Sequence, residues 1–220
     1  MRKIRKQSVL SESVTIFANG VCFKNPVLRG ALGLYPVVAA GYSLRNGLAL
    51  SVMMLVMMLP VCLVSGLAGQ KVPNWIRPAA VLLLSAIFYL PAYLLVEKMM
   101  PGIMSQLGIC GGLMVANSII LSRANDYAPD HISFAVLADS LGCTIGFAIV
   151  ICSVSALREL LSTGTLWGKN VLLEGVPQTI VTKPFFAFLL LGFFAALVQW
   201  INGRHDKDDK DAAKRKVTRV

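Results

Sequence analysis

The sequence predicts an all-α, polytopic membrane protein with six transmembrane helices, arranged as two inverted three-helix repeats with broken first and fourth helices. Three observations support this prediction. Of the 220 residues, 56% are hydrophobic and only 15% are charged, whereas an ordinary soluble domain has about 25% charged residues. The charges gather at the two ends of the chain, and long charge-free stretches fill the middle. Two of these stretches are interrupted by glycine and proline.

The basic excess of the chain, a net charge of +10, lies mainly in its ends. Residues 1–24 hold five Lys or Arg against one acid, and residues 202–220 hold seven against four. The 177 residues between them hold nine bases against six acids. This distribution argues against nucleic acid as a partner, because the charge sits on the tails of an apolar body. It is typical of a multi-pass protein of the inner (cytoplasmic) membrane, in contact with the lipid bilayer.

Charge-free stretches predict where the chain crosses the bilayer, since a spanning helix needs about 20 apolar residues. Four stretches have 19 uncharged residues or more, and they lie between Arg45 and Lys71, Arg77 and Glu97, Lys98 and Arg123, and Lys183 and Arg204. A fifth span is expected from about His131 to Leu157. The first candidate, between Arg29 and Arg45, has only 15 uncharged residues and contains Gly33 and Pro36. It is too short and too interrupted for a plain spanning helix.

A similar weakness recurs in the fourth span, which contains Pro101, Gly102, Gly108, Gly111, Gly112 and the polar pair Asn117-Ser118. Each interrupted segment opens a group of three spans, which is the pattern of an inverted repeat. Close helix packing through the glycines is an alternative explanation.

The expected organisation has three parts. These are a basic N-terminal segment over residues 1–24, a membrane domain over 25–202, and a charged, mobile tail over 203–220. The repeats of the membrane domain are expected at about 25–98 and 99–202.

The positions of the basic residues predict the orientation of the chain. Six spans place both ends on one side of the membrane, and that side then receives 16 of the 21 Lys and Arg residues. Because basic residues favour the cytoplasmic side, the N- and C-termini are both expected to be cytoplasmic.

A few polar residues within the spans are candidates for function. Asp139 lies near the start of the fifth span and is a possible ion contact, although a cap at the N-terminus of its helix is the favoured interpretation. Asn117 is a buried amide in a broken helix and must find partners; it can tie two helix halves together. The pair Arg158-Glu159 is interpreted as an interfacial stop signal. No soluble-enzyme motif is present, so no catalytic residue is assigned.

The five cysteines predict neither a disulfide framework nor a metal site. They are Cys22, Cys62, Cys110, Cys143 and Cys152. Their number is odd, they lie in or beside apolar runs, and they show no CxxC spacing or companion histidine. We expect them to pack as small polarizable residues.

Several motifs follow one another in a specific order along residues 24–202. They are Asn25-Pro26, Leu32-Gly33-Leu34-Tyr35-Pro36, Ala116-Asn117-Ser118 through Ala124, Asp139 with Gly142 and Gly146, Leu157-Arg158-Glu159-Leu160-Leu161, and Gly164-Thr-Leu-Trp-Gly168. In this order and register they resemble a known family, the RnfE/NqrD membrane subunits of the Rnf and Na⁺-translocating NADH:quinone reductase complexes. The resemblance implies a six-helix inverted-repeat fold, paired with a sister subunit of the RnfA/NqrE type and with other Rnf/Nqr-like subunits.

The resemblance also implies a cofactor whose ligands this chain lacks. In the family, each of two sister subunits gives two cysteines to a [2Fe-2S] cluster at their interface, one from each broken helix. Tyr35 and Ser118 occupy those two positions here, so both thiolates are absent. Phenol and hydroxyl oxygens are poor replacements for Cys at such a cluster. Cys110 lies eight residues before Ser118, about 12 Å along an intact helix, which is too far to reach the same iron.

The leading hypothesis is therefore a membrane subunit of an Rnf/Nqr-like complex that couples electron transfer to ion translocation. It is expected to be a scaffold or paralogue without its own iron-sulfur ligands, and to bind no cofactor alone. The resemblance is to a subunit of a translocating oxidoreductase. The alternative is a stand-alone transporter of ions or small solutes that uses the two broken helices as a midplane site.

Overall fold

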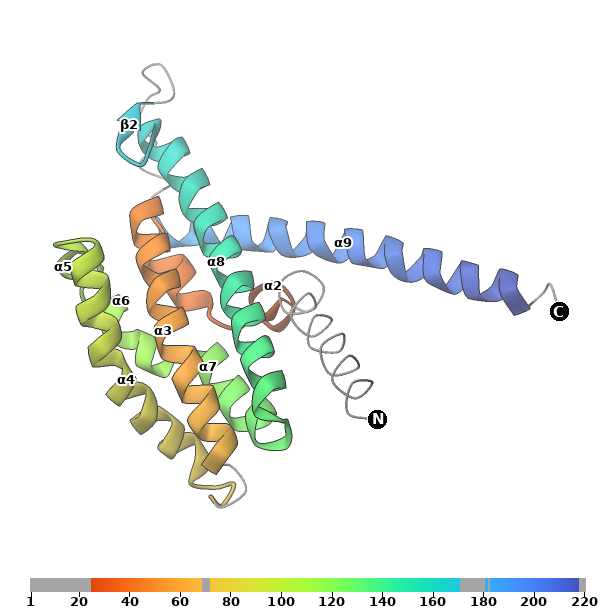
Figure 1. Ribbon diagram of the computed structural model, residues 1–220. Helices are drawn as coiled ribbons and strands as arrows, with labels where there is room; N and C mark the ends of the chain where they lie inside the picture. Colours follow the sequence, from red (N-terminus) through yellow and green to blue (C-terminus); the bar gives the residue numbers. More distant parts are fainter. Residues whose placement is uncertain (1–24, 69–71, 171–180, 182, 218–220) are drawn as a thin grey trace.

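The computed structural model describes residues 25–68, 72–170, 181 and 183–217, and its centre is a bundle of three long helices (Figure 1). They are α3 (Leu44–Ala68), α4 (Arg77–Met99) and α8 (Ser133–Thr163). Within the described part of the chain, these three helices are long and apolar enough to cross a membrane. The second, third and fifth predicted spans are thus present as continuous helices. The chain is a mostly helical membrane protein with several spans.

Helix α3 forms the centre of the core because it packs against both α8 and α4. Its four methionines, Met53, Met54, Met57 and Met58, are completely buried. Unbranched methionine side chains adapt to irregular gaps between helices. Helices α3 and α8 approach each other closely at Gly47, where an added Cβ atom would lie 2.7 Å from Ser155 Oγ. A small residue at this position therefore sets the spacing of α3 and α8.

The outer face of α4 is apolar and exposed. Leu83, Ile87, Leu90 and Leu94 each keep more than 60% of their surface accessible. A row of this kind would be unfavourable in water but matches the hydrocarbon of a bilayer. This face is therefore expected to contact lipid or another membrane protein.

The first interrupted span is not a single helix. It consists of α2 (Pro26–Gly30) and the π-helical segment η2 (Pro36–Ala40), joined by residues 31–35. Helix α2 ends where Ala31 takes a left-handed conformation with φ of 51°, and Gly33 follows with φ of 65°. These torsions place the break where the sequence predicted it.

The fourth span is more fragmented than its charge-free length suggested. The chain passes through α5 (Ile103–Leu107), α6 (Ile109–Gly112), the 3₁₀ segment η3 (Leu113–Ala116), α7 (Ser118–Ser122), the π-helical η4 (Arg123–Tyr127) and the 3₁₀ segment η5 (Ala128–Asp130). Gly102 and Gly108 have φ of 81° and 51°, so they change the chain direction. Among the described residues, neither would place a Cβ atom closer than 3.9 Å to a neighbour, so close helix packing does not explain these two glycines.

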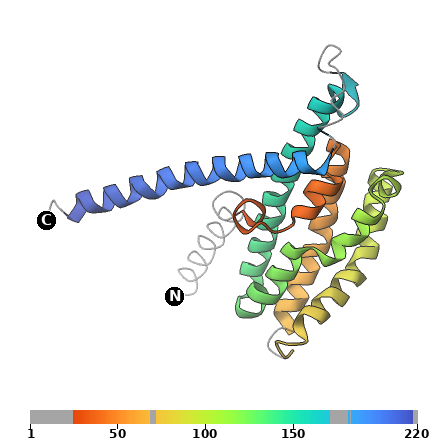
Figure 2. The same ribbon diagram turned by 180° about the vertical axis from the view of Figure 1, so that it is seen from behind.

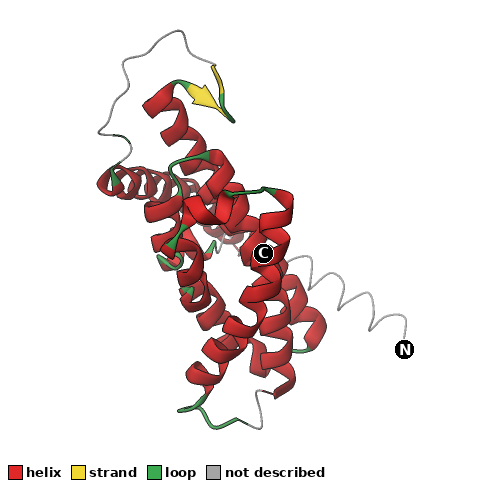
Figure 3. Cartoon of the chain, turned by 90° about the vertical axis from the view of Figure 1, so that its left-hand side faces the viewer, coloured by secondary structure: helices red, strands yellow, loops and turns green. Residues whose placement is uncertain are grey.

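The last elements are a short hairpin and a long helix. Strands β1 (Thr165–Leu166) and β2 (Lys169–Asn170) pair after α8, and α9 (Pro184–Val217) follows. The apolar part of α9, Pro184–Trp200, falls within the sixth predicted span, but it is shorter than the three helices that are long enough to cross a membrane. Helix α9 leaves the bundle at a steep angle instead of lying along it (Figures 1 and 2). It also continues to Val217 (Figure 1), so the charged end that was predicted as a mobile tail is helical to that residue. Figure 3 shows the described chain as helices, apart from the short hairpin and the loops.

The close approach at Gly47 generates a stability prediction. Replacing Gly47 by leucine forces α3 away from Ser155, so we expect a loss of about 1–3 kcal/mol in the free energy of unfolding. Thermal unfolding of the detergent-solubilised protein measures the effect. Gly192→Leu in α9 is the matched control, because no described atom lies within 4 Å of a Cβ atom there. Equal melting temperatures for the two variants would contradict the tight α3–α8 contact.

Candidate functional site

The two interrupted segments meet inside the membrane domain. The backbone N–H of Gly33 donates a hydrogen bond of 2.8 Å to Ser118 Oγ, across 85 residues of sequence. Gly33 also packs directly on Ile119, since an added Cβ atom would lie 2.6 Å from Ile119 Cδ1. The first and fourth predicted spans therefore cross at the residues that the sequence singled out.

Two buried asparagines cap the helical pieces at this crossing. Asn25 Oδ1 accepts hydrogen bonds from the N–H groups of Val27 and Leu28 at the start of α2, at 2.9 and 3.4 Å. Its Nδ2 donates to the carbonyl of Gly146 in α8, at 3.0 Å. The first broken segment thus begins with a side-chain cap, which supplies an acceptor for otherwise unsatisfied N–H groups.

Asn117 caps a helical segment in the fourth predicted span, as Asn25 does in the first. Its Oδ1 accepts a hydrogen bond of 2.9 Å from the N–H of Ile119, and its Nδ2 contacts Met114 Sδ at 3.6 Å. The side chain is completely buried. Asn117 therefore joins η3 to α7 across the break.

Tyr35 packs against the core beside the crossing. Its hydroxyl is buried and has no hydrogen-bond partner among the described residues. The helix between Cys110 and Ser118 is interrupted, so the separation of about 12 Å expected for an intact helix does not apply.

The donors at the crossing do not form a metal-binding set. Tyr35 and Ser118 present oxygen atoms, which are poor ligands for an iron-sulfur cluster. Among the described residues, no three His, Cys, Asp or Glu side chains come together in a way that would hold a metal ion. Ser118 Oγ is engaged as the acceptor for Gly33. The arrangement does not fit an iron-sulfur cluster, which requires thiolate or imidazole ligands.

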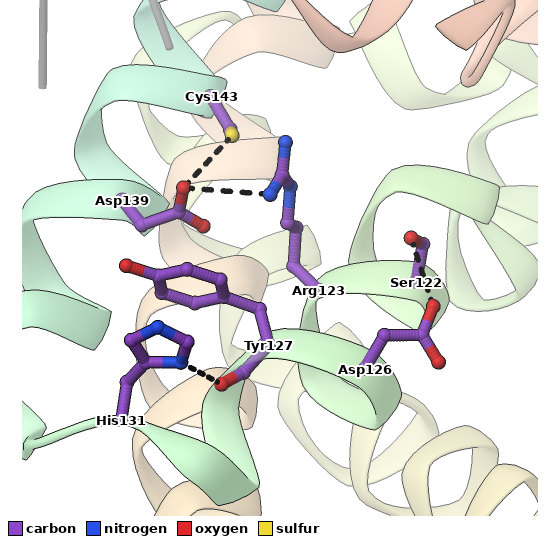
Figure 4. Close-up of polar contacts among 7 residues, drawn as sticks. All are labelled: Ser122, Arg123, Asp126, Tyr127, His131, Asp139 and Cys143. Carbon is purple, nitrogen blue, oxygen red and sulfur yellow. Dashed lines mark hydrogen bonds and ion pairs between the residues drawn. The ribbon is translucent and has the colours of Figure 1, made fainter. Parts of the chain in front are cut away.

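Asp139 forms a second candidate site (Figure 4), near the start of α8, whereas the β-hairpin follows the end of that helix. The predicted helix cap is wrong, because α8 begins six residues earlier at Ser133 and Ile132 is its N-cap. Asp139 Oδ1 instead lies 3.6 Å from Arg123 Nη1. The Asp139 side chain is 8% exposed and that of Arg123 is 25% exposed. Cys143 Sγ donates a weak hydrogen bond of 3.9 Å to the same carboxylate oxygen.

The rings of Tyr127 and His131 lie beside this ion pair (Figure 4). The Tyr127 ring stacks on the His131 ring, with 3.8 Å between centroids. The guanidinium of Arg123 lies 5.8 Å from the centre of the Tyr127 ring, within the range of a cation–π interaction. Sequence reasoning identified Asp139 but missed Arg123 and its aromatic neighbours. The arrangement can hold one positive charge next to a largely buried carboxylate.

The interpretation of Arg158-Glu159 as a stop signal is wrong, because both residues are buried. Arg158 is 1% exposed and donates hydrogen bonds of 3.1 Å to the carbonyls of Val38 and Gly41. It also donates to the carbonyls of Val181 and Lys183. It therefore satisfies carbonyl groups at the C-terminal end of the π-helical segment η2.

Glu159 completes this arrangement from the same helix. Its Oε2 accepts a hydrogen bond of 2.7 Å from the N–H of Leu44, and its Oε1 accepts one of 3.3 Å from the N–H of Gly168. Helical spacing would have identified the burial of Arg158. Phe147, Ile151, Val154 and Arg158 fall at i, i+4, i+7 and i+11, on one inward-facing stripe.

Comparison with known proteins gives a consistent match over nearly the whole chain. The family model described as "Rnf-Nqr subunit, membrane protein" matches residues 13–195. The E subunit of the ion-translocating oxidoreductase complex of Aliivibrio fischeri (strain MJ11) is 28% identical, over 93% of this chain and 97% of that protein. The E subunit of the same kind of complex in Shewanella sp. (strain MR-4) is 28% identical over 88% and 90% of the two chains. The E subunit of the Na⁺-translocating ferredoxin:NAD⁺ oxidoreductase complex of Acetobacterium woodii is 27% identical over 82% and 93%.

The contacts of Arg158 lead to a second stability prediction. Replacing Arg158 by methionine leaves several buried carbonyl groups without a donor, so we expect the free energy of unfolding to fall by about 3 kcal/mol or more. Arg158→Lys keeps the charge but not the planar set of donors. Its stability is expected to lie between those of the methionine variant and the wild type. Thermal unfolding in detergent is the measurement. Arg45→Met is the control, because Arg45 is exposed; similar melting temperatures for the two methionine variants would contradict the role of Arg158.

Proposed function

The chain belongs to the Rnf-Nqr family of membrane subunits, and on this premise we propose that it is a membrane subunit of an Rnf/Nqr-like electron transport complex that couples electron transfer to ion translocation. The observation that carries the proposal is the match, over most of both chains, to relatives that are named as the E subunit of such complexes.

Partners within the membrane are part of this proposal. We infer a sister subunit of the RnfA/NqrE type, together with other subunits of the complex. Helix α9 supports this inference, because it leaves the bundle and exposes large apolar side chains along its apolar part. They are Phe185, Phe188, Leu189, Phe193, Leu197 and Trp200. A neighbouring subunit would cover these side chains.

We propose two inverted repeats, over residues 25–98 and 99–202, between a basic N-terminal segment and a charged tail. Two features support the repeats. Each proposed repeat contains an asparagine-capped, broken segment, and the Gly33–Ser118 hydrogen bond joins the two. The excess of basic residues on one side supports an inner-membrane location with both termini in the cytoplasm.

We further propose that this chain supplies no iron-sulfur ligand. Tyr35 and Ser118 occupy the positions where the family resemblance implies cysteines. The hydroxyl of Ser118 serves the backbone of Gly33, and the phenol of Tyr35 is a large, partly polar group beside it. The chain then keeps the scaffold of the family and leaves cluster binding to other subunits.

Asp139 is proposed as an ion contact on the ion-translocation path. A mostly buried carboxylate next to a single cation is a place where a mobile cation can compete for the same oxygen atoms. In the structure Arg123 provides that positive charge at 3.6 Å. Arg123 would move away from Asp139 when an ion binds.

The cofactor proposal predicts that the cysteines of this chain do not hold iron. Cys110→Ser, made in the complex purified with its partner subunits, should leave the iron content and the EPR spectrum of the reduced complex unchanged. Cys152→Ser, in α8, is the control for replacing a partly buried thiol. Loss of iron in the Cys110 variant alone would show that this chain supplies a ligand. If the chain purified without any redox subunit and alone carried solutes across liposome membranes, the alternative function as a stand-alone transporter would be favoured.

The ion proposal predicts opposite effects of two substitutions. Asp139→Asn removes the carboxylate and should lower redox-driven ion transport by about tenfold or more. Arg123→Gln removes the competing cation and should lower the ion concentration that gives half-maximal transport. Both are measured in proteoliposomes that contain the whole complex. Asp126→Asn is the control, since Asp126 bonds to Ser122 at an exposed position. An unchanged ion dependence in both test variants would contradict the proposal.

A further inference from the structure

A pocket of about 180 Å³ lies between the C-terminal end of α3 and the N-terminal end of α4. Its walls are mainly apolar and include Val64 and Ala68 from α3 and Ala80 and Leu84 from α4. Among the described residues that line it, Arg77 is the charged one. The volume corresponds to about six water-sized groups, so it can take part of an extended hydrocarbon chain.

The position of the pocket places it at a membrane interface. It lies where two spanning helices end and begin, at Ala68 and Arg77. Trp75 precedes α4 by two residues and is 82% exposed. Tryptophan is enriched at the level of the lipid headgroups. Arg77 therefore lies next to the boundary between headgroups and hydrocarbon.

The local electrostatics favour an anion at this boundary. Arg77 is the first residue of the 23-residue helix α4, whose first turn contains no acidic residue. The N-terminus of a helix carries a partial positive charge, which adds to that of the guanidinium. Arg77 Nη1 and Nη2 donate to the carbonyls of Asn125 and Val72 at 3.4 and 3.3 Å. These long bonds hold the guanidinium beside the pocket.

We propose that this pocket binds one anionic phospholipid, with its phosphate on Arg77 and part of one acyl chain between α3 and α4. Apolar walls that meet one cation at headgroup level complement such a lipid, whereas a soluble phosphate would leave the walls uncovered. The predicted orientation places this end on the cytoplasmic side, where anionic lipids attract basic groups. The site lies apart from the Gly33–Ser118 crossing, so it does not depend on the redox proposal.

Lipid binding to the full-length protein in detergent tests the proposal. Phosphatidylglycerol should raise the melting temperature more than phosphatidylcholine does, and native mass spectrometry should detect one retained phosphatidylglycerol. Arg77→Gln should weaken this binding about fivefold, the effect of one basic contact near the membrane surface. Arg77→Lys should retain most of it. Ala80→Phe leaves Arg77 in place, fills the pocket, and should also reduce binding.

Arg45→Gln is the matched control, because it removes an exposed arginine at the opposite end of α3. It should bind phosphatidylglycerol as the wild type does. Equal effects of the two lipids would show only general solvation by lipid and would overturn the proposal. A full effect of glycerol 1-phosphate would assign the site to soluble phosphate and overturn it too. Unchanged binding in both Arg77→Gln and Ala80→Phe would place the lipid elsewhere.

Discussion

The structure depends on one constraint, which is that each backbone N–H and C=O group inside a membrane needs a partner within the protein. A continuous helix meets this requirement alone, and α3, α4 and α8 do so. The segments over residues 25–43 and 101–130 are broken, so they cannot satisfy all their own backbone groups. Their free backbone groups are met by side chains from elsewhere, and Ser118 provides one such partner to Gly33.

Helix α8 supplies a large share of these partners. Its Gly146 carbonyl accepts from Asn25, its Arg158 donates to four carbonyl groups, and its Glu159 accepts from the start of α3. A helix with this role has to carry charged residues on its buried face. This explains why the chain keeps Arg158-Glu159 inside a membrane domain, where unpaired charges are costly.

Composition and charge spacing predicted the features that depend on the solvent around the chain. The membrane class, the helices α3, α4 and α8, and the breaks near Gly33 and Gly108 all follow from apolar length and from glycine. The burial of Arg158 was missed because local rules place a charge near a helix end at the interface. The Arg123–Asp139 pair was missed because it joins η4 to α8 through tertiary packing, which no local pattern encodes. The direction of α9 likewise depends on contacts beyond its own sequence.

Arg158 and Arg123 both point into the protein, but their guanidinium groups make different contacts. These contacts indicate a structural role for Arg158 and a functional role for Arg123. The guanidinium of Arg158 is bonded to the carbonyls of Val38, Gly41, Val181 and Lys183. Those carbonyls belong to the backbone, so Arg158 cannot leave without disturbing the segments that it joins. The guanidinium of Arg123 meets Asp139 through one contact of 3.6 Å and keeps a quarter of its side-chain surface exposed. The contacts of Arg123 with Asp139 and with the Tyr127 ring are both made to side chains, so they can open by rotation of the arginine while the helices stay in place. An exchangeable cation is therefore compatible with the fold at Asp139, and a fixed one is required at Arg158.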